Sequence, residues 1–91
     1  MSGMYGSFGE AINLTATGNV GRAGQSKQLL GFYVNSTSTG VIQLRRGGSG
    51  GTVLGGQITP AVGFHPFPAD CPDGLHLTVV SGTIDLTMFV V

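Results

Sequence analysis

Residues 44–56, with the sequence LRRGGSGGTVLGG, decide between two fold classes. Two arginines, Arg45 and Arg46, lead into a loop rich in glycine. A phosphate-binding loop would place a lysine after its glycines and then begin a helix. Here the arginines come first, no lysine follows, and the loop continues into the apolar run TVL. The stretch therefore predicts a turn between two strands. Arg45 and Arg46 are expected to point to opposite faces, where one could pair with an acidic patch on a partner.

Glycine and proline exclude long helices elsewhere in the chain. The 91 residues include 17 glycines and four prolines, and the longest stretch without either is residues 83–91. In a helix interior, glycine costs about 1 kcal/mol and proline about 3 kcal/mol relative to alanine. An isolated helix shorter than about a dozen residues is marginal. We therefore predict an all-β chain.

Apolar and polar side chains alternate in several segments, as they do in strands with one buried face. The clearest segments are residues 28–36, 41–46, 75–80 and 83–91. In the first, Leu30 and Phe32 are expected on one face, and Leu29 and Tyr33 on the other.

Three further segments have weaker strand patterns. Residues 12–16 and 52–59 are short strand candidates, and residues 64–69 are expected to be extended. Because Pro66 and Pro68 cannot donate to a strand ladder, this last segment should lie at a sheet edge.

Short turn sequences separate these segments. Ser81-Gly82 predicts a two-residue hairpin, and STSTG at residues 36–40 predicts a longer one. Asp73-Gly74 is expected to turn the chain into the next strand. Short strands with such turns indicate a sandwich or barrel. We predict an antiparallel β-sandwich, jelly-roll-like, with seven or eight short strands.

The N-terminal end differs from the rest of the chain. Residues 1–9 contain Met4, Tyr5 and Phe8 between glycines and show no alternation. We expect a flexible N-terminal arm that docks on a neighbour, with a disordered terminus as the alternative. Residues 10–91 are expected to form a single β-sandwich domain.

The C-terminal end is apolar to its last residue. The sequence MFVV closes the chain, which predicts a last strand inside a sheet. Phe89 and Val91 lie on the face opposite Met88 and Val90, so this strand is expected to be covered on both faces. The cover for Phe89 is either the rest of the monomer or another subunit.

Charge is scarce, since the chain carries four positive and four negative residues and a net charge of zero. Nucleic-acid binders carry a basic footprint, so we expect no nucleic-acid partner. No apolar run approaches the roughly 20 residues of a spanning helix, and we expect no membrane partner. The N-terminus lacks a secretory signal pattern, which predicts a protein made in the cytoplasm and not exported by its own sequence. A charge-poor surface favours association with protein partners.

The candidate reactive residues lie close together in the sequence but lack the required spacing. They are His65, Asp70, Cys71, Asp73 and His76. Zinc sites favour tight Cys and His pairs, which are missing here. Cys71 lies in a segment that reads as a loop, and nearby carboxylates would raise its pKa. His76 alternates with core residues and should face outward. We expect no catalytic residues, no metal and no cofactor.

Two stretches carry a resemblance to a known class of proteins. They are GFYVNSTSTGVIQLRRGGSGGTVLGGQITPAVGFHPFP at residues 31–68 and GLHLTVVSGTIDLTMFVV at residues 74–91. Together they resemble small β-sandwich structural proteins of tailed bacteriophages, including capsid decoration (cement) proteins. The pattern consists of turns and alternating strands and holds no catalytic signature. Residues 1–27 fall outside it.

The resemblance implies a homotrimer on the outer capsid surface of a virion made in a host cytoplasm. There it would clamp neighbouring copies of the major capsid protein and stabilise the head. A tail, baseplate or fibre module is the alternative, and a small carbohydrate-binding sandwich is a third reading. A carbohydrate-binding sandwich would need exposed aromatic side chains. The residues expected to contact partners are Met4, Tyr5, Phe8, Tyr33, Arg45, Arg46 and Phe89.

Overall fold

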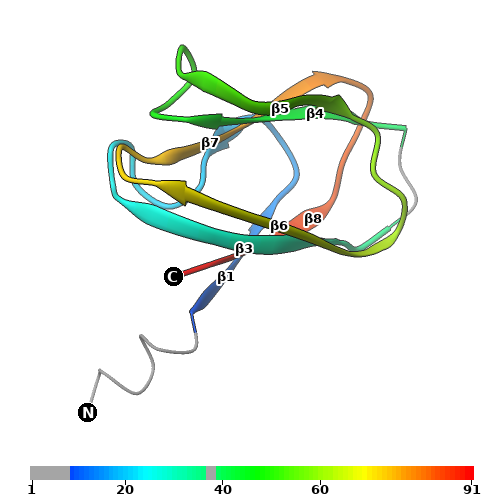
Figure 1. Cartoon of the computed structure of the whole chain (residues 1–91). Helices are drawn as coiled ribbons and strands as arrows, with labels where there is room; N and C mark the ends of the chain where they lie inside the picture. The colour runs from blue at the N-terminus through cyan, green and yellow to red at the C-terminus, as the bar shows by residue number, and fades with distance from the viewer. Residues whose placement is uncertain (1–8, 37–38) are drawn as a thin grey trace.

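The computed structural model describes residues 9–36 and 39–91, which form two antiparallel sheets packed face to face (Figure 1). The strands are β1 (Glu10–Leu14), β2 (Gly18–Asn19), β3 (Lys27–Val34), β4 (Val41–Arg46), β5 (Thr52–Ile58), β6 (Gly63–Cys71), β7 (Leu75–Ser81) and β8 (Leu86–Val90). No helix occurs in the described residues. The all-β prediction is confirmed, as is the expected number of strands.

The strand order identifies the sandwich as a jelly roll. One sheet has the order β1-β8-β3-β6 and the other the order β2-β7-β4-β5. The antiparallel pairs are nested, with β4 on β5, β3 on β6, β2 on β7 and β1 on β8. Two four-stranded sheets connected in this way are the jelly-roll arrangement, which confirms that prediction.

The glycine-rich loop lies at the innermost of these nested pairs. It joins β4 to β5, and the Gly51 N–H donates to the Gly48 carbonyl at 3.0 Å. Gly47 and Gly48 have φ values of 96° and 123°, which residues with a side chain rarely adopt. The loop is a turn between paired strands, as predicted.

The core lies between the sheets and is filled by alternate side chains of both. Its largest fully buried members are Phe32, Leu29, Ile42, Leu44, Leu75, Leu77, Leu86 and Met88. Full burial of one such side chain stabilises the fold by about 1.5–3 kcal/mol. The alternation predicted for β4, β7 and β8 is confirmed by these positions.

The face assignment predicted for β3 is wrong in its first half. The register of β3 against both β6 and β8 shifts between Leu29 and Gly31. Such a bulge adds one residue and reverses the alternation at that point. Leu29 therefore joins Phe32 in the core, whereas Leu30 is 42% exposed.

Two predicted hairpins are also wrong. Ser81-Gly82 lies between β7 and β8, which belong to different sheets, and residues 36–40 connect β3 to β4 in the same manner. Thr37 and Ser38 lie outside the described residues. Both connections cross from one sheet to the other, and Ile84 is buried in the core on the way to β8. Local turn chemistry is the same for a hairpin and for such a crossing.

Other predicted features are confirmed. The β6 strand, which contains Pro66 and Pro68, is an edge strand, and β8 lies between β1 and β3. Asp73-Gly74 forms a turn in which the Gly74 N–H donates to the Cys71 carbonyl at 3.2 Å. The two-residue strand β2 was missed because it is too short to show alternation.

Gly31 is the position where β3 is most crowded, and we predict that Gly31→Ala destabilises the fold. A Cβ atom there would lie 2.6 Å from the His65 carbonyl oxygen and 3.0 Å from Phe64 Cζ. The backbone of β3 or β6 must shift, at a cost of about 1–3 kcal/mol. Urea denaturation measures the free energy of unfolding. Gly50→Ala is the matched control, because no atom lies within 4 Å of its Cβ position. Equal stability of the two variants would contradict the packing described for β3.

Candidate functional site

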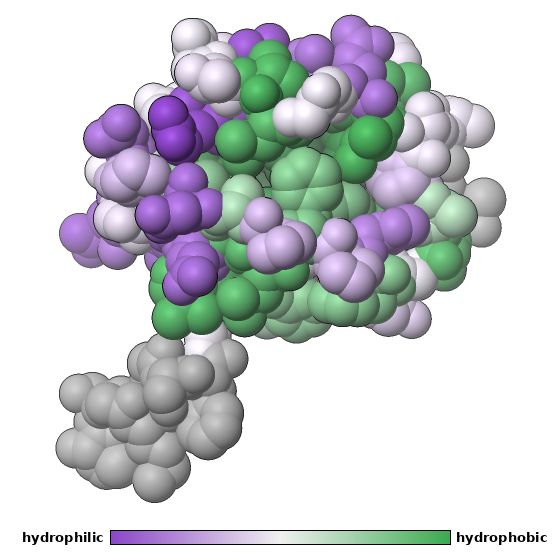
Figure 2. All heavy atoms as spheres, viewed as in Figure 1, coloured by the Kyte–Doolittle hydropathy of each residue, from purple (hydrophilic) through white to green (hydrophobic). Residues whose placement is uncertain are grey.

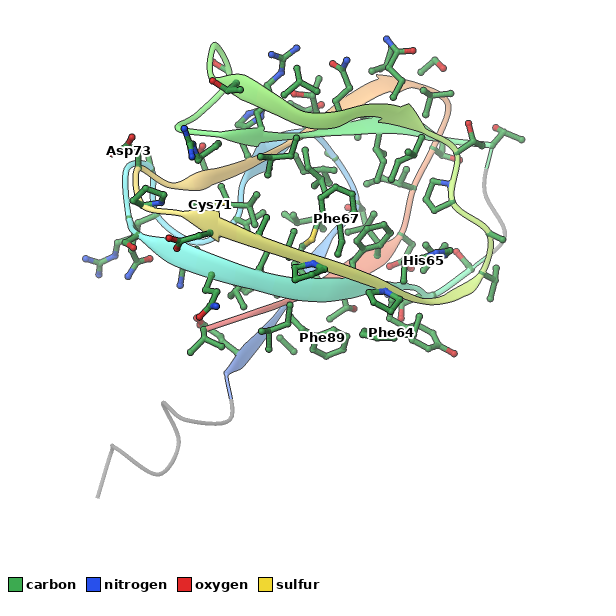
Figure 3. The ribbon with its side chains drawn as sticks, viewed as in Figure 1. Phe64, His65, Phe67, Cys71, Asp73 and Phe89 are labelled. Carbon is green, nitrogen blue, oxygen red and sulfur yellow. The ribbon has the colours of Figure 1, made fainter. Side chains whose placement is uncertain are left out.

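The outer side of the β1-β8-β3-β6 sheet exposes a row of large apolar side chains. Leu30 and Tyr33 come from β3, Phe64 from β6 and Phe89 from β8. Phe64 is 53% exposed, Leu30 and Tyr33 are 42% exposed, and Phe89 is half-buried. We call these four residues the aromatic face. Figure 3 shows Phe64 and Phe89 pointing away from the core, and Figure 2 shows apolar residues gathered along the lower side of the body.

The strand register brings these side chains together. Tyr33 lies opposite Phe64, and Gly31 lies opposite Phe89. The Phe64 and Phe89 rings are 6.0 Å apart between centroids and tilted by 58°. They meet across Gly31, which has no side chain to separate them. An aromatic pair of this geometry contributes about 0.5–1.5 kcal/mol beyond its buried area.

A polar network borders the aromatic face. The Asn13 and Asn35 side-chain amides both donate to Asp85 Oδ1, at 2.9 and 3.2 Å. The Asn35 amide also donates to Thr87 Oγ1 at 2.9 Å. These bonds connect β1 and β8 with the residue that follows β3, and they hold the Asp85 carboxylate in place. The border is therefore polar and fixed.

An ion pair marks the opposite end of the sheet. The Lys27 ammonium lies 3.1 Å from Glu10 Oε1, with the Lys27 side chain nearly buried and Glu10 exposed. The pair joins the first residue of β1 to the first residue of β3. The four residues of the aromatic face are uncharged, and the exposed Asp70 of β6 lies toward the ion-pair end, opposite Gln28. Contiguous exposed apolar surface with a polar rim is typical of protein interaction sites.

The structure separates the residues predicted to contact partners. Tyr33 and Phe89 lie on the aromatic face, whereas Arg45 and Arg46 belong to the other sheet. Met4, Tyr5 and Phe8 lie outside the described residues.

The Arg45 guanidinium donates hydrogen bonds within the chain. Its Nη1 donates to the Gly51 carbonyl and its Nη2 to Gln43 Oε1, each at 3.0 Å. These bonds fix the glycine-rich turn to the strand before it. Arg46 is exposed at the end of β4.

Two residues of the aromatic face, Leu30 and Phe64, were missed by sequence reasoning. Leu30 was assigned to the same face as Phe32 because the bulge leaves no trace in the alternation. Phe64 could have been found, since Phe64 and Pro66 alternate with His65 and Phe67 in the segment GFHPFP. This alternation places Phe64 on the face of β6 that points away from the core.

A concave feature lies beside the glycine-rich turn. A cavity of about 510 Å³ is lined by Asn19, Ala23, residues 47–51 and His76. No Lys or Arg side chain lines it in the described part of the chain. His76 was expected to face outward and does lie away from the core side chains of β7. It is nevertheless only 5% exposed.

The environment of His76 favours its neutral form. Burial lowers the pKa of His76, and the charge of neighbouring Arg45 lowers it further. Its Nδ1 lies 3.2 Å from Thr78 Oγ1.

The fold does not bring the remaining candidate reactive residues together into one site. His65 Nε2 lies 2.7 Å from the Ala61 carbonyl oxygen, and its ring stacks on Phe32. Cys71 is the last residue of β6 and is fully buried, so its assignment to a loop is corrected. Burial raises the pKa of the Cys71 thiol, as does Asp70, against an opposing effect of Arg46. Within residues 9–36 and 39–91, no group of three or more His, Cys, Asp or Glu residues could hold a metal ion.

Comparisons with protein-family models, with curated proteins and with solved structures found no match for this chain. No helix in the described part of the chain is long and apolar enough to cross a membrane.

We predict that His76 makes the protein less stable in mild acid. The pKa of His76 in the folded state lies below its ordinary value near 6.5, so the unfolded chain binds more protons as the pH falls through that value. The free energy of unfolding should therefore decrease as the pH falls below about 6.5. Urea denaturation at pH 8 and pH 5 measures this loss, and His76→Gln should show a smaller one. The same loss in both proteins would contradict the assignment to His76.

Proposed function

We propose that this protein is a non-enzymatic structural component of a phage virion. It binds the outer surface of an assembled capsid as a homotrimer and bridges neighbouring major capsid proteins. The observation that carries the proposal is the aromatic face, an exposed apolar surface without charge on a hydrogen-bonded sheet. Such a surface favours contact with protein, and the sequence resemblance supplies the kind of particle.

The physical properties of the aromatic face suit a permanent contact. Tyr33, Phe64 and Phe89 are large and have few rotatable bonds, so little conformational entropy is lost when they are covered. The sheet beneath them keeps their spacing fixed. Because the face is uncharged, its contacts should depend little on salt. A protein that binds only the assembled shell stabilises that shell by mass action.

Two other functions use features of the same surface. A tail, baseplate or fibre module would also bury the aromatic face against protein. A carbohydrate site would combine the exposed Tyr33 ring with the polar groups of Asn35 and Asp85 beside it. The experiment below separates these functions by the target that is bound.

We predict that the protein sediments with capsids that lack it and raises the temperature at which they release DNA. Phe64→Ser should weaken this binding roughly tenfold or more, because a buried aromatic residue often supplies about 2 kcal/mol at an interface. Val80→Ser is the matched control, since Val80 is an exposed apolar residue of the other sheet. Sedimentation with intact capsids, isolated tails and isolated capsid protein measures the target.

Three outcomes of this experiment would overturn the proposal. Binding to tails alone would favour the tail or fibre function. Binding to neither particle, together with binding to a glycan array that Tyr33→Ser abolishes, would favour carbohydrate recognition. Equal capsid binding by Phe64→Ser and wild type would show that the aromatic face does not contribute to capsid binding.

A further inference from the structure

We propose that the cavity beside the glycine-rich turn binds a small hydrophilic molecule through an oxyanion group, a carboxylate or a phosphate. This inference goes beyond the proposed function. The cavity belongs to the β2-β7-β4-β5 sheet, whereas the aromatic face belongs to the other sheet. Binding in the cavity therefore requires neither a capsid nor the aromatic face.

Three polar side chains lie side by side on the outer side of the β2-β7-β4-β5 sheet. Asn19 of β2 and Arg45 of β4 both lie opposite His76 of β7 in the strand register. Residues that lie opposite one another in an antiparallel pair point to the same face. The strand pairing therefore holds an amide, an imidazole and a guanidinium in one row, next to the turn that follows β4.

The glycine-rich turn encloses one side of this row. The Gly47 N–H donates to the Gly74 carbonyl at 2.9 Å, which holds the turn beside the start of β7. Asn19, His76 and residues 47–51 are among the residues that line the cavity of about 510 Å³. Sites for small molecules commonly have volumes of about 300–1,000 Å³. The cavity is therefore large enough for a small organic molecule.

His76 has a ring nitrogen without a partner at this cavity. Its side chain is nearly buried, and its Nδ1 lies 3.2 Å from Thr78 Oγ1. Because Thr78 lies further along β7, the opposite edge of the ring, which carries Nε2, faces the start of the strand and the cavity. Among the described residues, no hydrogen bond reaches Nε2. Buried polar atoms are nearly always hydrogen-bonded, so a ligand atom would complete the contacts of His76.

The groups around the cavity favour a negatively charged ligand. The backbone N–H groups of residues 48–50 donate to no other group in the described part of the chain, and no acidic side chain of that part lines the cavity. Arg45 adds a positive charge beside His76, and among the described residues it forms no ion pair. Its buried Nε also has no hydrogen-bond partner there. Backbone N–H groups of a turn and an unpaired positive charge together attract an anion.

Binding of an anion should be coupled to protonation of His76. Burial and the charge of Arg45 lower the pKa of His76 when the cavity holds no anion. An anion beside the ring favours its charged form and should raise this pKa. Two other charged residues lie near the cavity without lining it. They are Asp73, whose Cβ would lie 3.9 Å from a Cβ on Gly47, and the exposed Arg22.

NMR titration of the full chain tests the class of ligand with three probes that share a six-carbon hydroxylated body. Gluconate carries a carboxylate, glucose 6-phosphate carries a phosphate, and glucose carries neither. We expect saturable shifts of the His76 ring signals and of the amide signals of residues 48–50 with one or both anions, and none with glucose. His65, in the other sheet, is the internal control. Saturation with a single anion would support the proposal and identify the group. Non-saturating shifts with both anions, or equal binding of glucose, would overturn it.

A pH titration of the His76 ring signals, with and without the saturating anion, tests the contact with Nε2. We expect the anion to raise the pKa of His76 by about half a unit or more, which corresponds to roughly threefold tighter binding to the protonated form. The pKa of His65 should change little. An unchanged pKa of His76 in the saturated protein would overturn the proposal.

Two variants that each add one negative charge test the position of the anion. Asn19→Asp changes a residue that lines the cavity, and Gln57→Glu changes a residue of the same sheet that does not. Both positions are exposed, so both variants should fold. We expect Asn19→Asp to weaken anion binding about tenfold or more by repulsion between like charges, and Gln57→Glu to bind as wild type does. Equal affinity of the two variants would overturn the proposal. Failure of the site would leave the proposed capsid contact intact.

Discussion

The bulge in β3 between Leu29 and Gly31 is the constraint on which both faces of the β1-β8-β3-β6 sheet depend. One additional residue lets Leu29 and Phe32 both enter the core, although their spacing of three would place them on opposite faces of a regular strand. The same residue moves Leu30 to the outside. Gly31 then leaves room for the Phe64 ring to approach Phe89. The core and the aromatic face are therefore consequences of one local irregularity.

The two sheets have different roles in this account. Nested pairing outward from the glycine-rich turn positions β4, β5, β7 and β2, and Arg45 fixes that turn by two hydrogen bonds. The other sheet holds both ends of the described chain next to each other, through Gly9 and Val91. Its outer side carries the exposed apolar side chains of the aromatic face.

Local patterns predicted what depends on local chemistry. The glycine-rich turn, the buried side chains of β8 and the edge position of β6 follow from glycine, alternation and proline. The pairing of strands that are distant in the sequence could not be predicted from such local patterns. Ser81-Gly82 has the composition of a hairpin but crosses between sheets, because the pairing of β8 with β1 and β3 is decided by the core. Leu30 was misplaced for a similar reason, since a bulge changes the register without changing the sequence pattern.

Solvent accessibility of the aromatic face, compared between the free and the capsid-bound protein, tests the central claim most directly. Hydroxyl radicals oxidise exposed side chains, so mass spectrometry of Tyr33 and Phe64 reports whether the face is covered. The account predicts that both residues are oxidised in the free protein and much less when the protein is bound to capsids. Oxidation of Val80, on the other sheet, should be the same in both states. Equal oxidation of Tyr33 and Phe64 in both states would contradict the claim that this face is a protein contact surface.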